Sequence, residues 1–153
     1  MKRFLIIAVL IVSSFVSQAQ ELKWHTDVSD AAKIALEQKK PLMMFFTGSD
    51  WCGWCIRLQK EVFHKPEFAK WANDNVVLVE LDFPRKTQQS EELRNQNYSM
   101  QQMFGVTGYP TIWFVNPVQK EGKKVNLDAL GNIGYERGGP EVWISKSNKI
   151  LNK

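Results

Sequence analysis

The chain has 153 residues, of which 44% are hydrophobic and 24% charged, with a formal net charge of +4. This length is enough for one domain with a sizeable core. Loss of a leader carrying Lys2 and Arg3 would leave 18 basic and 16 acidic residues, a net charge of +2. So weak a positive balance argues against a nucleic-acid partner.

Residues 1–19 are predicted to form a signal peptide. A basic start precedes an apolar segment over 4–16, and residues 17–19 are the small-x-small cleavage site Ser-Gln-Ala. The alternative is an uncleaved membrane anchor, but the apolar segment is short for a span of roughly 20 residues. We therefore expect a soluble domain over 20–153, exported to the periplasm or another compartment in which disulfides persist.

The rest of the chain alternates between helix and strand signals. Asp27, Ser29 or Asp30 can cap the first helix, Pro41 follows its end, and Ser90 can cap a later helix. In chain order we expect a helix ending near residue 38, a strand at 42–46, helices at 56–63 and 67–72, a strand at 76–81, a helix after residue 90, a strand at 111–115, a turn at 116–123, a strand at 124–130 and a helix ending near residue 151. This order predicts an α/β fold in which a mixed central sheet lies between two helical layers.

The two cysteines, Cys52 and Cys55, lie where the 42–46 strand gives way to the 56–63 helix. The first turn of a helix has unpaired backbone N–H groups and the positive end of the helix dipole, which stabilise a thiolate. We therefore expect the pKa of Cys52 to be lowered, so that Cys52 attacks disulfides readily. Cys55 lies one helical turn further on and can close a disulfide with Cys52.

Two other roles for the cysteines are open, a structural disulfide and a metal site. A structural disulfide closing so short a loop stabilises by only about 2 kcal/mol, against nearly 5 for a loop of 100 residues. A metal site lacks partners, since neither histidine, His25 or His64, has zinc-finger spacing from the cysteines. Redox chemistry without a metal or other cofactor is the favoured interpretation.

The segment Thr47–Cys55 also resembles the active site of the thioredoxin superfamily, which carries W-C-x-x-C at a strand-to-helix junction. Val106–Thr111, with its Tyr-Pro-Thr end, resembles the second conserved loop of that superfamily. The motif F-F-T-G-S-D-W-C-x-W-C, followed by L-D-F-P, is more narrowly similar to periplasmic DsbH-type thiol:disulfide oxidoreductases. The resemblance runs from Leu42 to the C-terminus and implies a thioredoxin-like three-layer fold with a cis-proline at Pro110.

By this resemblance the chain exchanges its dithiol for disulfides of proteins or peptides. The residues implied to contact the substrate are Trp51, Gly53, Trp54, Tyr109 and Pro110. Gly53 allows the tight junction, while Pro110 orients the Tyr109 backbone toward an extended substrate. Two alternatives stay open, that Trp51 is a core residue and that Trp54 is simply an exposed aromatic residue.

The chain departs from ordinary thioredoxins at the buried carboxylate that lies six residues before the first cysteine. Phe46 occupies that position here. Glu80, on the neighbouring predicted strand, could replace it as a proton relay, because a buried carboxyl has a raised pKa. The alternative is a solvated or paired Glu80. Asp50 is expected to oppose thiolate formation slightly.

The leading hypothesis is an exported, monomeric disulfide reductase. The resemblance implies that a membrane electron-donor protein reduces it. A disulfide oxidase or isomerase on the same scaffold is the first alternative, because the redox potential alone decides the direction of exchange. A binding module with inert cysteines is the second.

Overall fold

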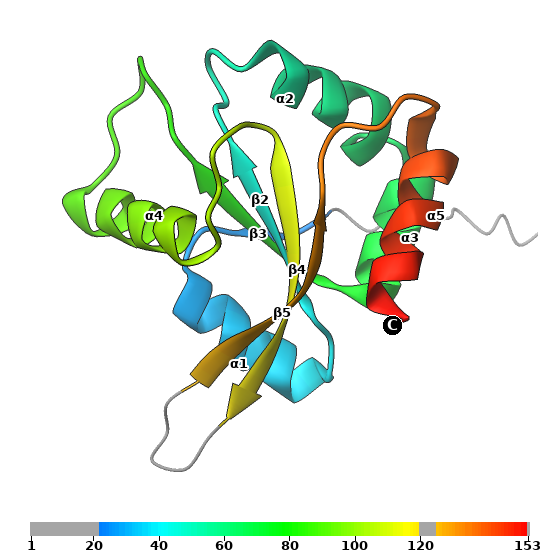
Figure 1. Ribbon diagram of the computed structural model, residues 1–153, viewed down its shortest axis with the longest axis horizontal. Helices are drawn as coiled ribbons and strands as arrows, with labels where there is room; N and C mark the ends of the chain where they lie inside the picture. The colour runs from blue at the N-terminus through cyan, green and yellow to red at the C-terminus, as the bar shows by residue number, and fades with distance from the viewer. Residues whose placement is uncertain (1–21, 120–124, 153) are drawn as a thin grey trace, which may run out of the picture.

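The computed structural model describes residues 22–119 and 125–152 (Figure 1). The expected signal peptide and its cleavage site lie outside these residues. In the ranges described, no helix is both long enough and apolar enough to cross a membrane.

The elements follow one another in the alternating order that the sequence predicts. They are β1 (Trp24–His25), α1 (Val28–Gln38), β2 (Leu42–Thr47), α2 (Gly53–Leu58), the π-helical turn η1 (Gln59–Phe63), α3 (Pro66–Asn75), β3 (Val77–Asp82), α4 (Glu91–Met103), β4 (Thr111–Gln119), β5 (Val125–Ile133) and α5 (Gly139–Leu151). The Asp27 carboxylate accepts the Asp30 backbone N–H at 2.8 Å, so Asp27 is the residue that caps α1.

The strands form one mixed sheet in the order β1-β3-β2-β4-β5. β2 lies at its centre, parallel to β3 and antiparallel to β4. One face packs against α2, η1, α3 and α5, and the other against α1 and α4 (Figure 1). This arrangement confirms the predicted mixed sheet between two helical layers.

Strand β2 explains why both faces of the sheet are covered. All six of its residues are buried, and successive side chains point to opposite faces. Met43 and Phe45 enter the core beneath the helix made of α2 and η1, which begins within the cysteine motif and is called the active-site helix below. Leu42, Met44 and Phe46 enter the core beneath α1. A continuous apolar strand is therefore required at this position.

The core beneath α2, η1, α3 and α5 is built mainly from aromatic rings. Phe63 packs edge-on against Phe45 with ring centroids 5.1 Å apart, and against Trp143 at 5.4 Å. Phe68 lies 4.6 Å from Phe63, and Trp71 lies 5.9 Å from Trp143. These contacts tie the active-site helix to α3 and α5 and fix its position over the sheet.

The predicted turn at 116–123 begins too early. β4 continues to Gln119, with Pro117 paired to Leu127 of β5. Proline is tolerated there because β2 pairs only with residues 111–115 of β4, so this part of β4 has one neighbouring strand rather than two. Residues 120–124 of the predicted turn lie outside the described chain.

The predicted start of the active-site helix was also wrong. It begins at Gly53 rather than Ile56, and its second half is the π-helical turn η1. The spacing over 56–63 predicted the wrong buried face, because Ile56 is 49% exposed whereas Leu58 and Val62 are fully buried. It also contained no signal for the first turn, which carries an exposed tryptophan, Trp54.

Candidate active site

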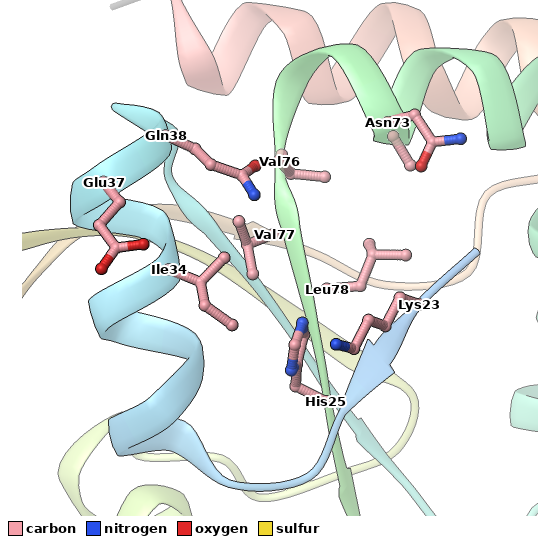
Figure 2. A pocket seen from close by; sticks show the side chains of 10 residues that line it. Lys23, His25, Ile34, Glu37, Gln38, Asn73, Val76, Val77 and Leu78 are labelled. Atoms are coloured by element: carbon pink, nitrogen blue, oxygen red, sulfur yellow. The ribbon is translucent and has the colours of Figure 1, made fainter. Parts of the chain in front are cut away.

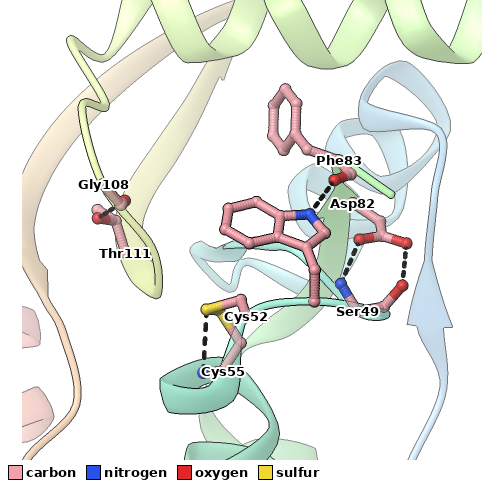
Figure 3. The surroundings of a disulfide bond; sticks show 8 residues. Ser49, Cys52, Cys55, Asp82, Phe83, Gly108 and Thr111 are labelled. Carbon is pink, nitrogen blue, oxygen red and sulfur yellow. Dashed lines mark hydrogen bonds between the residues drawn. A yellow bond between two sulfur atoms is a disulfide. The ribbon is translucent and has the colours of Figure 1, made fainter. Parts of the chain in front are cut away.

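The two cysteines form a disulfide at the junction between β2 and α2 (Figure 3). Cys52 is the N-cap residue of α2 and has an extended backbone. Its Sγ accepts a hydrogen bond from the Cys55 backbone N–H at 3.2 Å. The Cys52 backbone N–H donates to the Gly48 carbonyl at 2.8 Å, which closes the turn before the helix.

The two cysteine residues differ in the fraction of their surface that is exposed to solvent. Cys52 retains 6% of its surface, and Cys55 retains none. Cys55 lies under the first helical turn, in the same core cluster as Phe45 and Leu58. The outer cysteine thus keeps a small exposed surface, whereas the inner cysteine is fully buried.

Two carboxylates hold the turn that carries Cys52. Asp82, at the end of β3, accepts the Ser49 backbone N–H at 2.8 Å and the Ser49 hydroxyl at 2.5 Å (Figure 3). Asp50 accepts three successive backbone N–H groups, those of residues 85–87, at 3.0, 2.7 and 3.2 Å. Those bonds, that from Arg85 first, lower the pKa of Asp50. The turn is thereby tied to the end of β3 and to the middle of the β3–α4 connection.

Trp51 and Tyr109 meet on one side of the disulfide. The Trp51 indole N–H donates to the Phe83 carbonyl at 2.7 Å, and its ring packs edge-on against Tyr109 at 5.7 Å. The Arg85 guanidinium lies 3.8 Å from the centroid of the Trp51 ring. Burial raises the pKa of Tyr109, whose hydroxyl accepts a hydrogen bond from Gln101 at 2.6 Å.

Pro110 follows Tyr109 at the start of β4, and the peptide bond between them is cis. Thr111 donates its hydroxyl hydrogen to the Gly108 carbonyl at 2.8 Å, closing a short turn around the proline. Figure 3 shows this turn, through Gly108 and Thr111, in the surroundings of the disulfide. The two segments singled out by the sequence, 47–55 and 106–111, therefore lie together in the fold.

Trp54 lies apart from Trp51 and Tyr109, in a second aromatic group. It is 53% exposed, and its ring centroid lies 5.2 Å from that of Tyr135. The Arg57 guanidinium is 5.5 Å from each of these two rings. Tyr135 could not be predicted from the sequence, because no local pattern indicates that the segment after β5 packs against the active-site helix.

Glu80 lies on the sheet face that α2 covers. It is paired in register with Phe45, which belongs to the same core cluster as both cysteines. Burial, and then the charge of Asp82, raise the pKa of Glu80. Counting six residues back from Cys52 leads to the wrong face, because Phe46 belongs to the core beneath α1. Phe45 is the β2 residue on the cysteine side.

A cavity of about 360 Å³, lined by both polar and apolar side chains, lies at the other end of the sheet (Figure 2). Lys23, His25 and Glu37 contribute its charged or titratable groups, and Val77 at the start of β3 forms part of its wall. Both cysteines instead follow the end of β2. Among the residues described, no cluster of three or more His, Cys, Asp or Glu side chains is arranged to hold a metal ion.

Comparison with known proteins agrees with this geometry. Residues 28–127 match the family model described as a thioredoxin-like domain. The chain belongs to the thioredoxin-like family. It is 36% identical to the disulfide bond reductase DsbH of Chlamydia pneumoniae over 133 residues, 87% of this chain and 75% of that protein. These matches and the Cys52–Cys55 disulfide make it a thiol:disulfide oxidoreductase, which confirms the predicted enzyme class.

Other relatives agree on the fold. The thioredoxin-related protein DsbJ of Chlamydia pneumoniae is 30% identical over 120 residues, 78% of this chain but 33% of DsbJ. A solved DsbH oxidoreductase superposes with a TM-score of 0.74 at 34% identity, covering 86% of this chain and 85% of that one. A thioredoxin from Thermus thermophilus gives 0.60 at 16% identity, over 85% and 87% of the two chains, and supports the fold alone.

Proposed function

We propose that the chain is an exported reductase of protein or peptide disulfides that acts by dithiol–disulfide exchange through Cys52 and Cys55. The observation that carries this proposal is the pairing of a slightly exposed cysteine at a helix N-terminus with a fully buried one. Likeness to a disulfide bond reductase supports the reducing direction. An oxidase or isomerase would use the same chemistry, with electrons moving the other way.

In the reduced enzyme, the Cys52 thiolate attacks one sulfur of the substrate disulfide. That disulfide breaks, its second sulfur leaves and takes up a proton, and a mixed disulfide forms. The Cys55 N–H, which donates to Cys52 Sγ, stabilises the attacking thiolate. Cys55 then loses its proton and attacks Cys52, which releases the second substrate thiol. Two electrons pass to the substrate, and the chain returns to its disulfide state.

Glu80 is the proposed acceptor of the Cys55 proton, because its register puts it on the cysteine face of the sheet. The Asp82 carboxylate on the same strand is already bonded to Ser49, whereas the Glu80 carboxylate has no hydrogen bond to a described residue. Its raised pKa brings proton exchange with a thiol closer to neutrality. A direct contact is not required, since one water molecule can carry the proton between them.

Substrate contacts are proposed for Trp51, Gly53, Trp54, Tyr109 and Pro110. Gly53 faces open space, since no atom other than those of its chain neighbours and of the helix backbone lies within 4 Å of the position that its Cβ would take. The Tyr109–Pro110 segment can offer backbone groups to an extended substrate chain, which is one common way of recognising peptides. Trp51 supports that segment through its ring contact with Tyr109.

The proposed location is the periplasm or another oxidising compartment, reached through the N-terminal leader. The sequence pattern of residues 1–19 supports export. Because each turnover leaves the enzyme oxidised, a dithiol donor must return two electrons, and a membrane electron-donor protein is proposed for this role.

The exported chain should begin at residue 20 when its N-terminus is sequenced, and retention of residue 1 would exclude cleavage.

Replacing either cysteine tests the assignment of nucleophile and resolving thiol. Cys52→Ser should reduce insulin only at the background rate of dithiothreitol, because no accessible sulfur remains. Cys55→Ser should accumulate mixed disulfides on Cys52, because the second attack is lost. Both are measured by insulin turbidity and by mass spectrometry of trapped species. Trapping that requires Cys55 would reverse the assignment, and wild-type activity no higher than background would favour a binding module.

Glu80→Gln tests the proton relay through both activity and stability. Turnover at neutral pH should fall by about tenfold or more, because Gln cannot accept a proton. Since the pKa of Glu80 is raised in the fold, the stability conferred by protonated Glu80 is complete below the ordinary value of about 4.3 and is lost as the pH rises through the raised value. Gln keeps that stability, so the variant should melt at a higher temperature at neutral pH. An unchanged pH–rate profile would remove Glu80 from the mechanism.

A further inference from the structure

Trp54 is the large apolar side chain that the active-site motif leaves most open to solvent. It stands between the two cysteines in the sequence and is 53% exposed. Trp51 differs, because its indole N–H is bonded to the Phe83 carbonyl and Arg85 lies over its ring. Trp54 therefore has aromatic surface available for a partner, whereas the Trp51 side chain is occupied within the fold.

The exposed Trp54 ring rests on a hydrogen-bonded support. One oxygen of Glu61 accepts from Arg57 Nε at 2.8 Å, and the other accepts from the Tyr135 hydroxyl at 2.5 Å. Trp54, Arg57 and Glu61 follow at steps of three and four residues, so they share one face of the active-site helix. The Tyr135 ring, from the segment between β5 and α5, lies 5.2 Å from Trp54.

The charges of this support are matched within it. The hydrogen bond from Tyr135, and then that from Arg57, lower the pKa of Glu61, so Glu61 is ionised at neutral pH. Its charge offsets that of Arg57, with which it forms an ion pair. The surface left for a partner beside the disulfide is therefore the apolar ring of Trp54, which its contacts already hold in place. Prior ordering lowers the entropy lost when a partner binds.

We propose that Tyr135, Glu61 and Arg57 are positioning residues that hold Trp54 as a docking surface for an aromatic or large aliphatic side chain next to the substrate cysteine. The inference rests on the proposed function and narrows its substrates to disulfides whose cysteines have apolar neighbours in the sequence. Such segments are normally buried, so the preferred substrates are unfolded or misfolded chains rather than native proteins with exposed polar loops.

The test compares three disulfide-bonded peptides that differ only beside one cysteine, where they carry Phe, Ser or Glu. The reduced wild-type enzyme should reduce the Phe peptide about three- to tenfold faster than the Ser peptide at subsaturating concentration, mainly through a lower KM. Trp54→Ala should abolish this preference. Tyr135→Phe, which keeps the ring and loses the bond to Glu61, should weaken it.

Two controls separate docking from chemistry. Ile56→Ala removes another exposed apolar side chain of the same helix, 49% exposed, and should keep the preference. The rate of Ile56→Ala on bis(2-hydroxyethyl) disulfide, which has no flanking side chain, should equal that of the wild type. High salt should leave the preference intact, because the Arg57 charge is already paired with Glu61.

Several results would overturn the inference. Equal rates on the Phe and Ser peptides would show that no apolar docking occurs. A preference for the Phe peptide that persists in Trp54→Ala would show that the docking surface lies elsewhere. Faster reduction of the Glu peptide would make Arg57 an anion site instead. If the wild type reduced no peptide and no insulin, the proposed function itself would fail, and the inference with it.

Discussion

The chemistry depends on the hydrogen bond from the Cys55 backbone N–H to Cys52 Sγ, at 3.2 Å. It exists because the chain changes from strand to helix at Cys52, which leaves the N–H groups of the first turn without carbonyl partners. The same change of direction leaves the outer sulfur accessible and buries the inner one. In the proposed mechanism, this one local conformation supplies both a stabilised nucleophile and an internal thiol that releases the captured substrate.

The surrounding residues keep this stabilisation moderate. The two residues between the cysteines, Gly53 and Trp54, carry no charge. The nearby cations are engaged elsewhere, since Arg57 pairs with Glu61 and Arg85 lies over Trp51. A dithiol whose reduced form is strongly stabilised becomes a strong oxidant. With one backbone donor and no cation in the motif, we expect the reduced form to be stabilised less, as the proposed reducing direction requires.

Much of this arrangement could be predicted from the sequence, because local patterns determine it. The apolar strand at 42–46 and the cysteine spacing specify the junction, and the order of helices and strands specifies the mixed sheet. Contacts between distant segments could not be predicted. Nothing near Tyr135 indicates that it reaches Trp54, and a residue count placed the lost carboxylate at Phe46, on the wrong face. The extension of β4 through Pro117 was missed because proline is tolerated there only where β4 has no β2 partner, and this depends on where β2 begins.

The redox potential of the Cys52–Cys55 pair, measured by equilibration with glutathione, tests the account most directly. For a two-electron couple, about 30 mV changes the equilibrium tenfold, so the two directions of exchange are easily distinguished. We expect a value closer to the roughly −270 mV of thioredoxin than to the roughly −120 mV of the strong oxidant DsbA. A value near that of DsbA would contradict the account, because it would mean that the reduced form is strongly stabilised and that the protein oxidises its substrates.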